Sequence, residues 1–506
     1  MVKKKVKKER KLGPVTTIII LIVAIMVMSA IFSIFKINGQ ITAINNGTLE
    51  TSLITANNAF TKEGITYIFD NVITNFRLFE PLVLLIMSLI ATSIAEASGL
   101  LKATFQPLKK LRPNVITFLV LLIGILSSFI GEYNYIILLP LVLVLYKYLG
   151  RNQMLGVLTI FIGIVLGSGT GIISGYNDYI LGTLTQKSAT LEVDKTYQFL
   201  LNSNIYIMFI STILMCIIGT NLINKFLLPK LPKNIKEDDE LIVSKKAFVG
   251  STIVFVIFIL ILTYMITPGL PGSGLLLAPE NDHFIVKLLG DNAPFKEGFM
   301  LLFILMMMAC SFVYGKISGN IKTTNEYSVG LSKSFEKIGY VFVLMFFMSI
   351  LTNLITWTNV GQIIATSLID FMSKLQFSGI ALIVVMFVLI ILISMVVPST
   401  LTKWEIASPL LVPLFMRSNI TPDFTLFIFK VADGIGKCIT PLFIYFIIML
   451  AFLQKANNAK TDSVTIFGTL KIMAPTVGLI TALWLLIIIT WYIVGLPLGP
   501  GMYPTL

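Results

Sequence analysis

The chain has 506 residues, of which 56% are hydrophobic and only 12% are charged, and its formal net charge is +13. This composition excludes a soluble globular protein, in which about a quarter of the residues are charged. The lysine and arginine residues lie scattered between apolar runs rather than on one basic face. This pattern argues against nucleic-acid binding and for loop lysines on the cytoplasmic side of a membrane.

Apolar runs of the length that crosses a bilayer recur along the sequence. The first follows the basic segment MVKKKVKKERK and is too long for the apolar region of a signal peptide, so we predict a retained span with a cytoplasmic N-terminus. The predicted fold is an all-α polytopic membrane protein with about nine transmembrane helices. These helices are expected at residues 15–36, 80–101, 154–187, 204–226, 247–266, 298–315, 335–357, 424–453 and 470–495.

Two further apolar stretches, residues 114–148 and 376–416, are predicted to be re-entrant hairpins because each is interrupted by a polar tip. The tips read SSFIGEYN and SMVVPSTLTKWE. Each hairpin is followed by a span that small and polar residues break, with GSGTGIISGYND inside residues 154–187 and ADGIGKCITP inside residues 424–453. Polar groups are expensive inside a membrane, so these interruptions indicate a functional site.

The two halves of the chain repeat this order of hairpin and broken helix. Aligning Pro140 with Pro409 places Tyr135 on Trp404 without a gap. The span count puts the two hairpins on opposite sides of the membrane, so we predict inverted repeats whose tips and breaks meet near the midplane. A chance match between hydrophobic patterns is the alternative. The predicted units are a tail, first span and external loop at 1–79, a first repeat at 80–226, a loop with two scaffold spans at 227–334, and a second repeat at 335–506.

A broken helix leaves backbone groups without intrahelical partners. The freed carbonyls can ligate a cation, and the N-terminal ends of half-helices can face an anion. Gly169 and Gly171 permit such a break and a close approach of a ligand. Pro398 and Pro441 end helices where no backbone donor is needed.

Charged residues inside the second broken span are the main candidates for the transport path. Asp433 is interpreted as a proton carrier or a substrate-facing carboxylate, and the alternative is a structural ion pair with Lys430 or Lys437 at helical spacing. Three interpretations of Lys437 remain open. Its ammonium takes the place of a coupling cation beside Asp433 or Glu132, it binds a substrate carboxylate, or it extends to water.

The other candidates have two interpretations each. Glu132, at the first hairpin tip, contacts a ligand or proton, or it is a helix-end charge in a water-filled vestibule. Asp178 caps a helix or lines the path. Trp404 stacks on an aromatic ring or a cation, or it packs on a neighbouring helix. Trp484 and Trp491, in the last span, are predicted to face lipid or the membrane interface.

Four segments carry a resemblance to a known family. They are AEASGLL at 95–101, TKWEIASPLLVPLFM at 402–416, KVADGIGKCITPLFIYF at 430–446 and GLPLGPG at 495–501. They resemble elements of the p-aminobenzoyl-glutamate transporter (AbgT) family, and the likeness extends from about residue 80 to the end. The resemblance implies nine spans with two hairpins, a homodimer in a bacterial inner membrane, and aminobenzoyl-glutamate-like substrates or antimetabolites. It places Trp404, Asp433, Pro441 and Asp178 in or near the substrate path.

The sequence departs from the family pattern at the predicted centre. Ser128, Gly171, Ser394 and Lys437 stand where the family has asparagine, and Glu132 stands for aspartate. These replacements bear on two properties, the coupling ion, a proton or sodium, and the exact substrate.

We predict a secondary active transporter that works by alternating access, is coupled to protons, and binds substrate between the hairpin tips and broken helices. A dicarboxylate or short-chain acid carrier of the wider ion-transporter superfamily is the alternative. Catalytic, metal and cofactor sites are not expected, because HExxH and GxSxG motifs are absent and the single histidine, His283, lies in a polar loop. The predicted path residues are Ser128, Glu132, Gly169, Gly171, Asp178, Ser399, Trp404, Asp433, Lys437 and Pro441.

Overall fold

The computed structural model describes residues 12–45, 48–232, 240–279, 283–336, 338–375, 377–457 and 464–506. Among these residues, ten helices are long and apolar enough to cross a membrane. The predicted membrane-spanning character of the chain is therefore confirmed. The basic tail at residues 1–11, which the sequence places in the cytoplasm, lies outside the described residues, as does part of the loop between the two halves.

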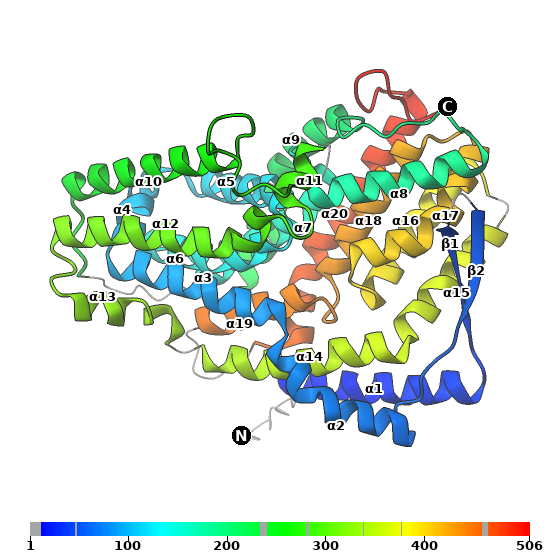
Figure 1. Ribbon diagram of the computed structural model, residues 1–506, viewed down its shortest axis with the longest axis horizontal. Coiled ribbons are helices and arrows are strands. Elements are labelled where there is room, and N and C mark those ends of the chain that lie inside the picture. The colour runs from blue at the N-terminus through cyan, green and yellow to red at the C-terminus, as the bar shows by residue number, and fades with distance from the viewer. Residues whose placement is uncertain are drawn as a thin grey trace, which may run out of the picture.

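The N-terminal region contains structure that the sequence analysis did not predict. Residues 38–77, expected to be an external loop, hold an antiparallel strand pair in register from Gly39 opposite Ile54 to Asn45 opposite Thr48, followed by an amphipathic helix. The pair is clear beside the first helix in Figure 1. The elements are α1 (Pro14–Ile34), β1 (Gly39–Asn45), β2 (Thr48–Ile54), α2 (Lys62–Arg77) and α3 (Glu80–Ala97).

The first predicted hairpin and broken helix both appear as interrupted helices. The hairpin turns at a 3-10 segment over Ser127–Ile130 and at Gly131, whose φ of 61° favours glycine. The broken span is interrupted between Thr170 and Tyr176. The elements are α4 (Leu100–Phe105), α5 (Pro113–Leu126), α6 (Tyr133–Tyr148), α7 (Gln153–Thr170), α8 (Tyr176–Glu192) and α9 (Ile205–Leu222).

The second half repeats this order. Its hairpin turns around Pro398, and its broken span is interrupted between Cys438 and Ile444. Helix α15 and the short helices α11 and α13 were not predicted. The elements are α10 (Lys245–Ile266), α11 (Phe284–Leu289), α12 (Pro294–Ser318), α13 (Thr324–Gly330), α14 (Gly339–Thr358), α15 (Val360–Lys374), α16 (Gly379–Val396), α17 (Thr400–Arg417), α18 (Pro422–Cys438), α19 (Ile444–Ala456) and α20 (Ile466–Val494).

The bounds of the helices follow the predicted sequence repeat. Aligning Pro140 with Pro409, each inside its helix, places α6 on α17, α7 on α18 and α8 on α19. The aligned glycines also pack alike. A Cβ at Gly167 would lie 2.7 Å from the Ile125 carbonyl oxygen, and one at Gly436 would lie 2.6 Å from the Ile391 carbonyl oxygen. The inverted orientation of the halves and the re-entrant depth of the hairpins stay predictions.

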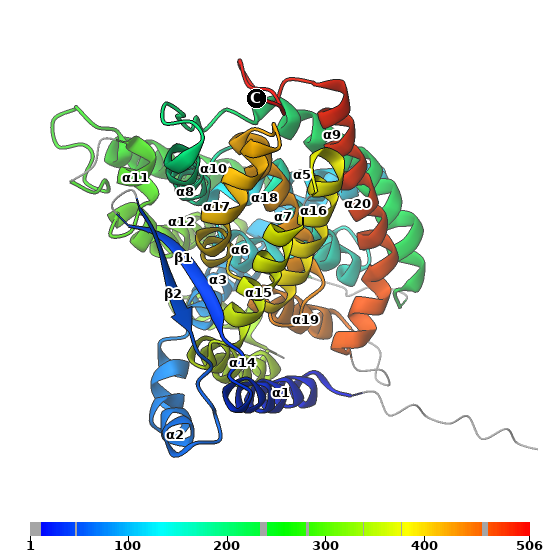
Figure 2. The same ribbon diagram turned by 90° about the vertical axis from the view of Figure 1, so that its right-hand side faces the viewer.

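Helices α7 and α18 form the centre of the molecule. Every residue of α7 except Ser168 is buried, and every residue of α18 except Lys430 and Lys437 is buried. In contrast, only Ala247 and Ser251 of α10 are buried, so most of its apolar surface faces outward. Figure 1 shows α7 and α18 between the outer helices, and Figure 2 shows α9, α16 and α20 lying side by side along another face.

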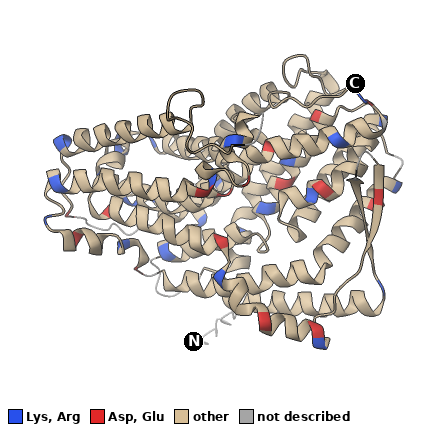
Figure 3. Cartoon of the chain, in the orientation of Figure 1, with Lys and Arg blue, Asp and Glu red and all other residues tan. Residues whose placement is uncertain are grey.

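Charged side chains follow this arrangement. In Figure 3 the long outer helices α10 and α12 are uncharged over most of their length, while red and blue segments gather at helix ends and near the middle of the molecule.

The burial of two tryptophan side chains corrects one prediction. Trp484 and Trp491, expected to face lipid, are 1% and 6% exposed because α20 turns these side chains toward the core.

Candidate functional site

A cavity of about 500 Å³ lies where both hairpin tips and both helix breaks converge. Its walls come from the first tip, the start of α3, the tip-proximal ends of α7 and α17, the starts of α8 and α12, the C-terminal part of α18, and residues 443 and 445. The three partly exposed residues of the two central helices, Ser168, Lys430 and Lys437, all line it. Of the predicted path residues, the cavity is lined by Ser128, Glu132, Asp178, Ser399 and Lys437.

Asp433 lies directly behind the cavity wall and is completely buried. Its Oδ1 accepts a hydrogen bond from Ser394 at 3.0 Å and pairs with the ammonium of Lys403. Its Oδ2 accepts a hydrogen bond from Thr400 at 2.6 Å and lies 3.1 Å from Nζ of Lys437. Four donors thus converge on one carboxylate, which is the degree of compensation that a buried charge requires.

This cluster, Asp433 with Lys403 and Lys437, has one more positive charge than negative charge. The Lys403 side chain is fully buried, whereas the Lys437 side chain is 13% exposed and lines the cavity. The excess positive charge is therefore presented to the cavity by Lys437. Nζ of Lys437 also donates to Thr400 and lies 5.5 Å from the centre of the Phe443 ring.

Asp178 and Lys430 form a second ion pair on the cavity wall, with Nζ 2.6 Å from Oδ1. Asp178 also accepts a hydrogen bond from the backbone N–H of Gly175 at 2.8 Å, which fixes the start of α8. Both interpretations of Asp178, as a cap and as a lining residue, therefore fit its position. The sequence analysis offered Lys430 as a partner of Asp433. In the structure Lys430 instead pairs with Asp178, which belongs to the first half.

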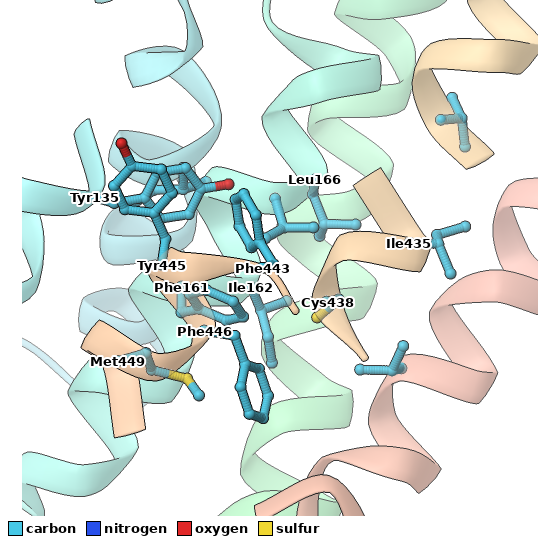
Figure 4. Close-up of a cluster of buried hydrophobic side chains, with 14 of the residues drawn as sticks. Tyr135, Phe161, Ile162, Leu166, Ile435, Cys438, Phe443, Tyr445, Phe446 and Met449 are labelled. Atoms are coloured by element: carbon cyan, nitrogen blue, oxygen red, sulfur yellow. The ribbon is translucent and has the colours of Figure 1, made fainter. Parts of the chain in front are cut away.

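Glu132 accepts a hydrogen bond from the hydroxyl of Tyr445 at 2.7 Å. The ring of Tyr445 stacks on that of Tyr135, with centres 4.6 Å apart and an interplanar angle of 15°. Phe443 packs against the edges of both rings, at 5.4 Å and 5.3 Å. Figure 4 shows the three rings together, with Phe161 and Phe446 packed beneath them. The cavity therefore has an aromatic wall that both halves build.

The other predicted path residues lie outside the cavity lining. Trp404 is completely buried, packs on Phe429 at 4.4 Å between ring centres, and donates hydrogen bonds to the Leu181 carbonyl and the Thr185 hydroxyl. Of the two interpretations of Trp404, this position fits packing on a neighbouring helix. Gly169 packs on Val431, and Pro441 lies between α18 and α19.

Gly171 packs against the first hairpin tip. A Cβ at this position would overlap Oγ of Ser128, so the approach of the broken helix to the tip requires glycine. Ser128 lines the cavity, and its buried Oγ has no hydrogen-bond partner among the described residues. Ser399 accepts a hydrogen bond from the Thr402 backbone N–H and caps α17 at the cavity rim.

Sequence reasoning missed the aromatic wall and the cross-half pairs. Tyr445 bonds a residue 313 positions away and Lys430 one 252 positions away, so no local pattern connects them. One feature of the sequence could have indicated the aromatic wall. Tyr135 and Phe443 each lie a few residues from a polar interruption, and in the structure both side chains line the cavity.

A second cavity, of about 690 Å³, lies near the C-terminal ends of α3, α6 and α19. It is lined by Glu96 and Lys147, whose Oε1 and Nζ are 2.8 Å apart.

Across the part of the chain that the structure describes, no group of His, Cys, Asp and Glu side chains is arranged to hold a metal ion. Cys216, Cys310 and Cys438 are buried free thiols.

The sequence pattern of the AbgT transporter family matches residues 9–506. The chain belongs to the AbgT transporter family. The family's p-aminobenzoyl-glutamate transport protein of Escherichia coli (strain K12) is 26% identical over 498 residues, which cover 97% of this chain and 94% of that protein. The predictions of a transporter rather than an enzyme, and of a multi-pass membrane protein, are thereby confirmed.

Two solved AbgT-family structures also align with the chain. The YdaH transporter of Alcanivorax borkumensis is 23% identical, with a TM-score of 0.48, and the alignment covers 97% of this chain and 100% of that one. MtrF of Neisseria gonorrhoeae, described as illuminating a class of antimetabolite efflux pumps, is 24% identical, with a TM-score of 0.48 and 98% coverage of both chains.

Proposed function

We propose that this AbgT-family chain is a proton-coupled secondary transporter that carries aromatic carboxylates of the aminobenzoyl-glutamate type by alternating access. The observation that carries the proposal is the central cavity, where an excess positive charge at Lys437 faces an aromatic wall. A carboxylate group matches the first feature and an aromatic ring matches the second. The relative from Escherichia coli, named for p-aminobenzoyl-glutamate transport, supports this substrate class.

Proton coupling is supported by the charge of the Asp433 cluster. A sodium ion binds where carboxylate and carbonyl oxygens outnumber cations, but Asp433 already faces two ammonium groups. A third cation there would meet like charges at close range in a medium of low dielectric constant. A proton has no such requirement for space or for several free oxygen ligands.

The orientation of the protein and its assembly belong to the same proposal. The N-terminus is placed in the cytoplasm of a bacterial cell, with the chain in the inner membrane, because lysine-rich loops alternate with acidic ones along the sequence. A homodimer is proposed on the resemblance to the family. Transport would follow alternating access, in which the core around the central cavity moves against a scaffold made by the remaining spans.

The test is flux into proteoliposomes under separately imposed proton and sodium gradients, with labelled p-aminobenzoyl-glutamate and labelled succinate. We expect saturable uptake of the aromatic compound that follows the proton gradient. Transport of succinate alone would support the dicarboxylate carrier instead. Flux that rises linearly with concentration would indicate a channel and contradict the proposal.

A further inference from the structure

The aromatic wall of the central cavity separates two groups of opposite charge. At one end, Nζ of Lys437 lies 5.5 Å from the centre of the Phe443 ring. The Phe443 ring lies 5.3 Å from that of Tyr445, whose hydroxyl donates to Oε2 of Glu132 at 2.7 Å. Two rings therefore lie in sequence between an ammonium group and a carboxylate group, and all four residues line the cavity.

Neither group has a counter-ion of its own among the described residues. Lys437 shares Asp433 with Lys403, so its cluster keeps one positive charge. Glu132 receives a hydrogen bond from Tyr445 but lies within ion-pair distance of no lysine or arginine among the described residues. Glu132 and Lys437 form no ion pair with each other, so each can bind a group of the substrate.

We infer that the cavity binds its substrate in one orientation, with a carboxylate at Lys437, the aromatic ring against Phe443 and Tyr445, and an amino group on that ring donating to Glu132. The inference rests on the proposed function and goes beyond it by assigning recognition of the aryl amine to Glu132. Tyr445 acts as a positioning residue, because its hydroxyl fixes one carboxylate oxygen and leaves the other to accept from the substrate.

This arrangement predicts which substrates are preferred. A substrate whose amine donates to Glu132 gains a hydrogen bond to a charged acceptor, and an analogue without the amine does not gain it. A hydrogen bond to a charged acceptor corresponds to a preference of about tenfold or more. Ring compounds that carry both a carboxylate and an amino group should therefore be preferred over those that lack the amine.

The experiment compares p-aminobenzoyl-glutamate with benzoyl-glutamate, which lacks the amine, as labelled substrates in proteoliposomes. For the unmodified protein we expect a KM for benzoyl-glutamate about tenfold higher or more. Glu132→Ala should bring the two KM values together, and Glu132→Gln, which retains an acceptor oxygen, should keep part of the difference. Lys437→Gln should raise both KM values and leave their ratio unchanged. Glu405→Ala, an exposed carboxylate outside the cavity lining, serves as the matched control.

Equal KM values for both compounds in the unmodified protein would overturn the inference while the proposed function stands. Uptake of neither compound would overturn both. If Glu132→Ala does not fold, Tyr445→Phe provides the second variant, because it removes one hydroxyl from a ring that keeps its packing. A smaller KM ratio with Tyr445→Phe supports the assignment, and an unchanged ratio contradicts the positioning role.

Discussion

The two halves of the molecule use the carboxylates around the central cavity differently. Glu132 and Asp178, from the first half, bind Tyr445 and Lys430 of the second half. Asp433, from the second half, finds its four partners within that half, on α16, α17 and α18. Movement of one half against the other would therefore break the first set of contacts and leave the second intact. The Asp433 cluster joins three helices of one half, whereas the contacts of Glu132 and Asp178 join the two halves.

The largest expected effect breaks the internal cluster. Asp433→Asn leaves the fully buried ammonium of Lys403 without a counter-charge, which destabilises a protein by about 3–5 kcal/mol. Asp178→Asn breaks a partly exposed pair and is expected to cost about 1 kcal/mol or less. Apparent melting temperatures of the purified variants in detergent measure both effects.

The double variant Asp433→Asn with Lys403→Met is the control for this prediction. It removes both members of the buried pair, and most of the lost stability should return. Equal shifts in melting temperature for Asp433→Asn and Asp178→Asn would show that the two halves do not differ in this respect.

A smaller effect is expected at the first hairpin tip. Gly171→Ala places a Cβ against Ser128, and overpacking of this kind destabilises by about 1–3 kcal/mol. Gly478→Ala, in α20, is the matched control because its Cβ would meet no atom within 4 Å. There the higher helix propensity of alanine should stabilise by up to about 1 kcal/mol. A similar loss at both positions in a thermal melt would contradict the close approach at the tip.

Lys437→Asn tests whether the Asp433 cluster presents its excess charge to the substrate. The KM for p-aminobenzoyl-glutamate should rise about tenfold, which corresponds to about 1.4 kcal/mol, and uptake should gain no dependence on sodium. Lys187→Asn, at an exposed position on α8, should leave the KM unchanged. Uptake by Lys437→Asn that requires sodium would instead favour the interpretation that this ammonium replaces a coupling cation.

The smallest effect is expected at Trp404. Trp404→Phe removes an N–H that bonds the Leu181 carbonyl and the Thr185 hydroxyl, so stability should fall by about 1–2 kcal/mol while the ring packing remains. Because Trp404 lies outside the cavity lining, the KM should not change. A KM increase without a fall in melting temperature would return this residue to the substrate path.

The sequence alone predicted the outline of the fold and the position of the site, because charged and helix-breaking residues are costly at mid-membrane depth and are retained there mainly for function. Each predicted span contains a helix, and both interruptions fall where GSGTGIISGYND and ADGIGKCITP predicted them. The strand pair at residues 39–54 and the helices α2, α11, α13 and α15 were missed.

Within the site, the approach of Lys437 to Asp433 followed from helical spacing, whereas the pairing of Lys430 with Asp178 did not. The latter depends on which face of α18 meets α8, and this is decided by packing between segments far apart in the chain. For the same reason, Trp484 and Trp491 were misplaced: an apolar helix shows no preference for lipid or core in its sequence alone.

The complete burial of Lys403 has a consequence for how the chain enters the membrane. Its counter-charge, Asp433, is on the following helix and is synthesised later. A lone lysine in an inserting apolar hairpin is unfavourable, by up to about 2.5–3.5 kcal/mol where it reaches the centre of the bilayer. Because the counter-charge is on α18, we expect the hairpin of α16 and α17 to be stable in the bilayer only after α18 has emerged from the ribosome. The three helices are therefore expected to integrate together.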